Sequence, residues 1–217
     1  MIPSLFDEDD LRQNERRVLA SGATLLRGFA LPFERDLVDS IESITRDSPF
    51  RHMTTPGGFA MSVATSSCGT YGWVSDSAGY RYASEDPERG RPWPPMPEPF
   101  QRLALDAAAA GGYADFRPDA CLINRYAPGA RLSLHQDRDE RSFAYPIVSV
   151  SLGIPAIFVF GGMKRTDPAR RIPLRHGDVV VWGGPSRLYF HGVLPLQEEM
   201  HPLLGRYRIN LTFRRAA

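Results

Sequence analysis

The stretch from residue 119 to residue 214 decides the fold, because short apolar runs alternate there with glycine, proline and aspartate. Eight such runs follow one another: ACLINRY (120–126), LSLH (132–135), IVSVSLG (147–153), AIFVF (156–160), RIPL (171–174), DVVVWG (178–183), RLYFHGV (187–193) and RYRINLTFR (206–214). Many short strands at this spacing are typical of a sandwich or jelly roll. We therefore predict a mainly β, α+β protein with a double-stranded β-helix (jelly roll) at its C-terminal end.

The residues before this stretch predict an α/β cover. Apolar residues at helical spacing indicate a helix over 32–48, and a second helix is expected over 98–110. Residues 9–21 are also helix-friendly, and 23–29 resemble a short strand. The Gly/Ser/Thr-rich region 54–82 predicts hairpins and loops.

Length and composition indicate one folded unit. The chain has 217 residues, 42% of them hydrophobic, and a net charge of +1. This overall charge indicates neither a nucleic acid nor a membrane as binding partner. We expect one domain over 1–217, with an N-terminal extension and helices over 1–118 and the core over 119–217. We find no signal peptide and no apolar run of the roughly 20 residues that a membrane helix needs, so a cytoplasmic location is expected. Cys68 and Cys121 have no metal-binding or redox spacing.

A candidate metal site combines His135 and Asp137 with the distant His191. Two histidines and one carboxylate form the facial triad that binds non-haem Fe(II) and leaves positions open for oxygen chemistry. Alternate residues of a strand point the same way, so His135 and Asp137 can share one ion. Zinc is the competing metal, since three N/O ligands also form catalytic zinc sites.

The last run carries polar residues at every second position, namely Arg208, Asn210, Thr212 and Arg214. An edge strand with one solvated face gives the same alternation. Two arginines on one face also suit a dicarboxylic acid, because arginine binds carboxylates bidentately. Asn124 and Tyr126 share a face of another run and can donate hydrogen bonds to carboxylate oxygens. 2-Oxoglutarate fits this set as a co-substrate.

The surrounding motifs carry a resemblance to a known family. The segments PDACLINRYAPGA (118–130), LSLHQD (132–137), GDVVVWGG (177–184) and NLTFR (210–214) resemble those of the bacterial AlkB family of Fe(II)- and 2-oxoglutarate-dependent nucleic-acid demethylases. This resemblance implies oxidative demethylation of alkylated bases such as N1-methyladenine and N3-methylcytosine, with release of formaldehyde. It also implies a β-hairpin nucleotide-recognition lid, alkylated single-stranded DNA as the partner, with RNA or duplex DNA as alternatives, no membrane partner, and a monomer.

The resemblance implies roles for individual residues. The iron ligands are His135, Asp137 and His191. The residues expected to bind 2-oxoglutarate are Asn124, Tyr126, Arg208, Asn210 and Arg214. Those expected to bind the substrate are Trp73, Tyr80, Tyr82, Asp139, Arg165 and Thr55. From their positions alone, the three aromatic residues of the lid suit base stacking and core packing equally well.

Some positions depart from the family pattern, and other functions stay open. Ile209 replaces an aromatic residue, Arg131 replaces a common lysine, and the segments 139–145 and after 201 diverge. One alternative is a 2-oxoglutarate-dependent hydroxylase of a protein or small-molecule substrate. Another is a non-catalytic jelly-roll module that binds zinc structurally.

Overall fold

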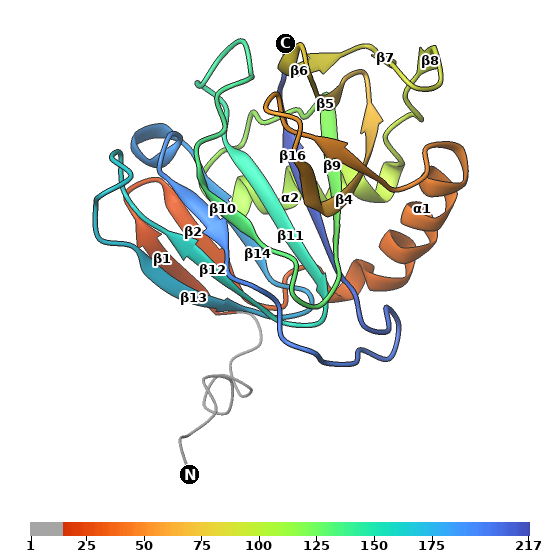
Figure 1. The fold of residues 1–217 in the computed structure, drawn as a ribbon. Coiled ribbons are helices and arrows are strands. Elements are labelled where there is room, and N and C mark those ends of the chain that lie inside the picture. The colour runs from red at the N-terminus through yellow and green to blue at the C-terminus, as the bar shows by residue number, and fades with distance from the viewer. Residues whose placement is uncertain (1–14) are drawn as a thin grey trace.

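The computed structural model describes residues 15–217, which form two facing β-sheets with helices behind the larger one (Figure 1). The larger sheet has the strand order β1 (Arg16–Ala20), β2 (Ala23–Leu26), β14 (Val179–Trp182), β11 (Ile147–Gly153), β16 (Arg208–Arg214), β9 (Ala120–Tyr126), β4 (Ala60–Gly69) and β3 (Arg51–Thr54). The smaller sheet has the order β10 (Leu132–His135), β15 (His191–Val193), β12 (Ala156–Phe160) and β13 (Arg170–Leu174). Every strand pair within these two sheets is antiparallel, and the expected jelly roll is confirmed.

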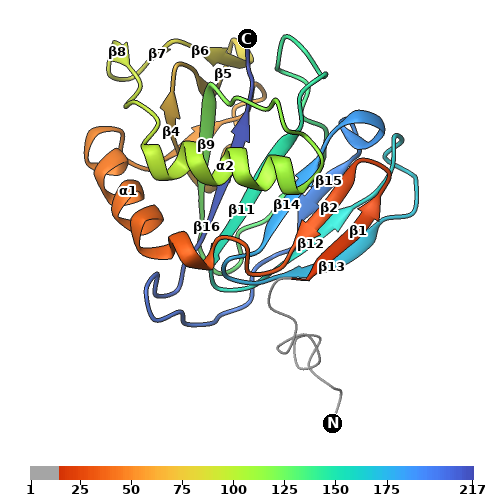
Figure 2. The same ribbon diagram turned by 180° about the vertical axis from the view of Figure 1, so that it is seen from behind.

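Two apolar cores hold these layers together. Between the two sheets, Phe158 of the smaller sheet packs near Trp182 of the larger one, with ring centroids 6.0 Å apart. Behind the larger sheet lie α1 (Glu34–Asp47) and α2 (Glu98–Ala110), of which α2 crosses β9, β16 and β11 (Figure 2). Phe100 of α2 meets Phe213 edge-on at 5.7 Å. Both helices were expected, the first from its spacing of apolar residues, and each has one buried face.

The alternation along β16 has a structural cause that differs from an edge strand. This strand lies in the middle of the larger sheet, between β11 and β9, and all seven of its residues are buried. Ile209, Leu211 and Phe213 belong to the core under the helices. The polar residues between them, Arg208 among them, therefore face the space between the sheets. A strand buried on both faces with charges on one of them indicates a site rather than a solvated surface.

Short elements complete the fold. The hairpin of β5 (Gly72–Asp76) and β6 (Gly79–Ala83) stands at the open end of the sandwich, beside the end of β16 (Figure 1). The remaining elements are β7 (Glu85–Asp86), β8 (Arg91–Pro92) and the 3-10 helices η1 (Leu31–Phe33) and η2 (Gly184–Ser186). Hairpins were expected in this part of the N-terminal half. None of the described residues belongs to a helix that is long and apolar enough to cross a membrane.

Three expectations need correction. The helix expected over 9–21 is wrong where the structure describes it, because Arg16–Ala20 is strand β1; its first residues lie outside the described part. Gly22, at φ 77°, turns the chain so that β1 pairs with β2, and this pairing overrides the local helix preference. The strand over 187–193 is shorter than expected, because only His191–Val193 pairs. The N-terminal half is also more than a cover, since β1–β4 extend the larger sheet at both ends.

Candidate active site

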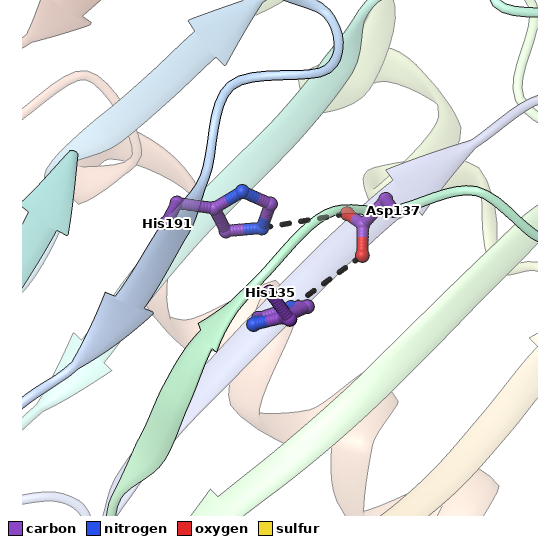
Figure 3. Close-up of side chains that lie close together, drawn as sticks. All are labelled: His135, Asp137 and His191. Atoms are coloured by element: carbon purple, nitrogen blue, oxygen red, sulfur yellow. Dashed lines mark ion pairs between the residues drawn. The ribbon is translucent and has the colours of Figure 1, made fainter. Parts of the chain in front are cut away.

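Two neighbouring strands of the smaller sheet carry the candidate metal ligands (Figure 3). His135 ends β10 and His191 begins β15, and the two are direct cross-strand partners. Asp137 lies two residues beyond the end of β10, in a segment without helix or strand, so strand alternation does not orient it. Its Oδ1 lies 3.6 Å from His135 Nε2 and its Oδ2 lies 3.6 Å from His191 Nε2. One ligand atom from each residue falls within 4.8 Å of the others.

Both imidazole rings are oriented for metal binding. His135 Nδ1 lies 2.9 Å from the carbonyl oxygen of Ser133, and His191 Nδ1 lies 2.9 Å from that of Tyr189. Because a carbonyl only accepts, each Nδ1 carries the proton and donates it. Each Nε2 then presents its lone pair toward Asp137, as metal-ligating histidines do when the other nitrogen is hydrogen-bonded. The three residues therefore fit an Fe(II) ion.

A close approach of strands makes this geometry possible. Gly192 follows His191 in β15, and a Cβ atom at this position would lie 2.6 Å from the carbonyl oxygen of Leu132. Gly192 lies within the strand, and its missing side chain lets β15 approach β10 closely enough to bring the two histidines together.

Asp137 is held as a carboxylate. Burial alone would raise its pKa, but the positive charge of Arg214 holds the pKa well below its usual range. Arg214 Nη2 donates to Asp137 Oδ2 at 2.8 Å. In turn the charge of Asp137 outweighs the burial of Arg214 and raises the pKa of that guanidinium. A permanently ionised carboxylate is the form that binds a metal ion.

The site is open rather than closed. Among the described residues, the cluster comprises three ligands and no fourth. Structural zinc sites use four protein ligands, whereas three ligands facing a cavity leave positions for exchangeable ones. This cavity has a volume of about 630 Å³, lies between the two sheets and is lined by all three ligands. Its size is within the range of small-molecule sites.

One arginine in the cavity lacks partners. Arg208 is 2% exposed, and its Nη2 donates to Ser151 Oγ at 3.0 Å. Its Nε and Nη1 have no hydrogen-bond partner among residues 15–217. The guanidinium carbon lies 4.9 Å from the centre of the Tyr126 ring, and burial lowers the pKa of Arg208. Buried donors without partners are rare, and a carboxylate would satisfy both of these.

The other residues expected at the 2-oxoglutarate site fall into two groups. Asn124, Tyr126 and Arg214 line the same cavity as Arg208. Asn210 also lines it, but its Nδ2 already donates to Ser149 Oγ and to the Val150 carbonyl, both at 2.8 Å. Thr212 Oγ1 donates to Asn210 Oδ1 at 2.9 Å. The amide of Asn210 is thus used within the sheet, where it orients its neighbours.

The hairpin β5–β6 supplies aromatic side chains at the mouth of the cavity. Trp73 and Tyr80 stack with ring centroids 5.6 Å apart and an interplanar angle of 12°. Trp73 Nε1 donates to Asp139 Oδ2 at 2.7 Å, so this carboxylate is tied to the hairpin. Tyr82 is half-buried and donates to Glu140 Oε1 at 3.1 Å, and Thr55 lines the same cavity. Tyr80, by contrast, is 48% exposed, and both tyrosine side chains line the cavity.

The arginines divide into two groups. Arg131 lines the cavity, but Arg165 does not; it lies on the loop after β12, 5.2 Å from the ring of Phe190. Arg51 and Arg81 are engaged in ion pairs with Asp86 and Asp76 at 2.8 Å and 2.7 Å. Of these four arginines, only Arg131 lines the cavity.

Sequence reasoning missed two residues next to the metal ligands. Glu140 and Arg187 are 6% and 3% exposed, and they lie within ion-pair distance of each other. Glu140 stands three positions after Asp137 in a segment without helix or strand. Arg187 follows η2 in a run that we interpreted as strand. No periodicity marks either position, so only the tertiary structure reveals them.

The fold and the triad define the class of protein. The chain belongs to the 2OG-Fe(II) oxygenase superfamily, whose family model matches residues 22–214. Within this class it groups with the AlkB dioxygenases. It is 58% identical over 198 residues to the alpha-ketoglutarate-dependent dioxygenase AlkB of Escherichia coli, covering 91% of this chain and 92% of the relative. The expected Fe(II)- and 2-oxoglutarate-dependent dioxygenase is thereby confirmed.

Two further relatives are more distant. The solved structure of OsALKBH1 superimposes with a TM-score of 0.82 at 30% identity and covers 93% of this chain and 100% of that one. The nucleic acid dioxygenase ALKBH1 of Homo sapiens is 34% identical over 121 residues, which is 56% of this chain and 31% of the human protein.

Proposed function

We propose that this dioxygenase oxidatively demethylates alkylated bases, such as N1-methyladenine and N3-methylcytosine, in single-stranded DNA, with RNA as a second substrate. We further propose that it works as a cytoplasmic monomer. The observation that carries the substrate proposal is the pair Trp73 and Tyr80 at the mouth of a cavity that ends at the metal ligands. Aromatic platforms of this kind stack on bases, and enzymes that react with a base take it from a single strand or flip it out of a duplex.

Relatives support the same substrate class. The human relative is named a nucleic acid dioxygenase, and a relative from Arabidopsis thaliana, 41% identical over 45% of this chain, is named a DNA N(6)-methyladenine demethylase. Asp139 supports the proposal chemically. Its Oδ2 accepts a hydrogen bond from Trp73. Its Oδ1 has no hydrogen bond within residues 15–217, so it can accept one from an exocyclic amine of the base.

The residues divide the work within the cavity. His135, Asp137 and His191 would hold Fe(II), and Arg208 with Tyr126 would bind the far carboxylate of 2-oxoglutarate. Fe(II) bound there supplies the chemistry by which O₂ converts 2-oxoglutarate to succinate and CO₂ and hydroxylates the methyl group. The hairpin holds the base in position for the reaction. The hydroxymethylated base then loses formaldehyde.

The test is formaldehyde release from a single-stranded oligonucleotide that contains N1-methyladenine. Fe(II), ascorbate and 2-oxoglutarate are each left out in turn, and an unmethylated oligonucleotide is the control. We expect release only when both Fe(II) and 2-oxoglutarate are present, and none from the Asp137→Ala variant. Wild-type release by that variant would refute the metal assignment.

Other outcomes would point to the alternative functions. Consumption of 2-oxoglutarate without formaldehyde from any methylated DNA or RNA would indicate a hydroxylase of a protein or small molecule. Tight zinc binding without any turnover would indicate a structural zinc module. Light scattering of the purified protein tests the proposed monomer, and a mass near twice 24.2 kDa would contradict it.

A further inference from the structure

One buried arginine connects several parts of the segment that follows the metal ligand. Arg187 Nη1 donates to the main-chain carbonyl of Asp137 at 3.0 Å, and its Nε donates to that of Tyr145 at 3.0 Å. Its Nη2 lies 2.9 Å from Glu140 Oε2. The three nitrogens of one planar guanidinium thus contact the beginning, the middle and the end of segment 137–145. No residue of that segment is in a helix or strand, so these contacts take the place of secondary structure.

The same contacts close a ring around the metal site. Arg214 lies between two carboxylates, with Nη2 at 2.8 Å from Asp137 Oδ2 and Nε at 3.2 Å from Glu140 Oε1. Glu140 in turn accepts from Tyr82, which belongs to the hairpin β5–β6. Two carboxylates and two guanidiniums therefore balance each other inside the protein. Without Arg187, Glu140 and Asp137 would compete for Arg214 alone.

We propose that Arg187 is a positioning residue that fixes the metal ligand Asp137 and the base-facing Asp139 through its three contacts with segment 137–145. It acts on Asp137 from the main chain, while Arg214 acts on its carboxylate. This role depends on the shape of the guanidinium, because lysine has one ammonium group and cannot span three acceptors. The inference rests on the proposed function for the metal assignment and for the part that concerns Asp139.

The direction in which metal affinity changes on replacing Arg187 distinguishes a positioning role from an effect of its charge. Loss of a positive charge beside a divalent cation site raises cation affinity if charge alone matters. Loss of a group that orients a metal ligand lowers the affinity, typically about 10- to 100-fold. Arg187→Met removes both the charge and the shape, and Arg187→Lys removes only the shape. Arg27→Met is the matched control, because Arg27 is 6% exposed, pairs with Asp178 at 2.6 Å and does not line the cavity.

The experiment titrates the metal-free full chain with Co(II). Binding is followed by the quenching of tryptophan fluorescence, because Trp73 and Trp182 line the cavity. We expect both Arg187 variants to bind Co(II) about 10- to 100-fold more weakly. The Arg27→Met protein should bind Co(II) like wild type, even where its thermal midpoint falls. Unchanged affinity in Arg187→Lys, or higher affinity in Arg187→Met, would overturn the proposal. If Arg187→Met fails to fold, Arg187→Lys decides alone.

A second readout tests the effect on the base. A displaced Asp139 leaves the methyl group poorly placed, so the ratio of succinate to formaldehyde should rise in Arg187→Lys and stay at the wild-type value in Arg27→Met. A wild-type ratio together with wild-type Co(II) affinity would show that Arg187 only contributes stability. Failure of wild type to release formaldehyde would refute the proposed function, and the Co(II) titration would still decide the positioning role.

Discussion

Arg208→Ala should raise the KM for 2-oxoglutarate more than any other single change among the cavity residues. The guanidinium is buried, and its Nε and Nη1 have no partner among the described residues. Two charge-assisted hydrogen bonds to a carboxylate contribute about 1.5–3 kcal/mol each, and truncating one partner of a buried charge pair costs about 2–5 kcal/mol. A loss of about 3–5 kcal/mol corresponds to a KM for 2-oxoglutarate raised roughly 100- to 4,000-fold.

The assay measures succinate release as a function of 2-oxoglutarate at saturating Fe(II) and methylated oligonucleotide. Arg208→Lys keeps the charge but offers a single donor group, so its KM should lie between those of wild type and Arg208→Ala. Arg125→Ala is the control, because Arg125 lies on the neighbouring strand against the rings of Phe50 and Tyr207, outside the cavity. A KM within twofold of wild type in Arg208→Ala would remove this residue from the co-substrate site.

Three further changes test the hairpin, the strand contact and the pH dependence. Trp73→Ala should weaken binding of single-stranded oligonucleotide by about 1–3 kcal/mol in fluorescence anisotropy, and equal affinity would argue against base stacking. Gly192→Ala should lower stability by about 1–3 kcal/mol in urea unfolding, because its Cβ would press on the Leu132 carbonyl. Gly57→Ala should leave the stability unchanged, because a Cβ atom at this position would have no contact under 3.6 Å. Burial and the neighbouring His176 lower the pKa of His201 below 6.5, so its stabilising effect is present above pH 6.5 and is lost as pH falls. His201→Asn should therefore lose less stability than wild type between pH 7.5 and pH 5.5, and parallel losses would contradict this.

The metal triad could be predicted from the sequence because its residue types are distinctive. Two histidines and an aspartate embedded in β-type runs predicted the ligand set, and the structure brings their ligand atoms within 4.8 Å. The reason given for their convergence was incomplete, however. Asp137 lies in an irregular segment beyond β10 and its carboxylate is held by Arg214, which no spacing rule describes. The 2-oxoglutarate and nucleotide contacts remain predictions that the experiments above test.

Local pattern also failed where distant partners decide the structure. Residues 16–20 favour a helix by composition but form β1, because β2 offers hydrogen bonds and Gly22 allows the turn between them. Residues 187–190 look like strand but lie in the turn that carries Arg187. In both cases contacts with other segments of the chain, which local composition does not specify, decide the structure.

The sequence by itself determined the class of fold, the metal ligands and the polar face of β16, since these depend on residue type and on the two-residue period of a strand. Tertiary structure alone decided which polar groups are already satisfied. Asn210 is occupied within the sheet, Arg208 retains unpaired donors, and Arg187 with Glu140 joins the ring around Asp137. Hydrogen-bond satisfaction depends on distances of about 3 Å between residues far apart in the chain, and no one-dimensional pattern encodes such distances.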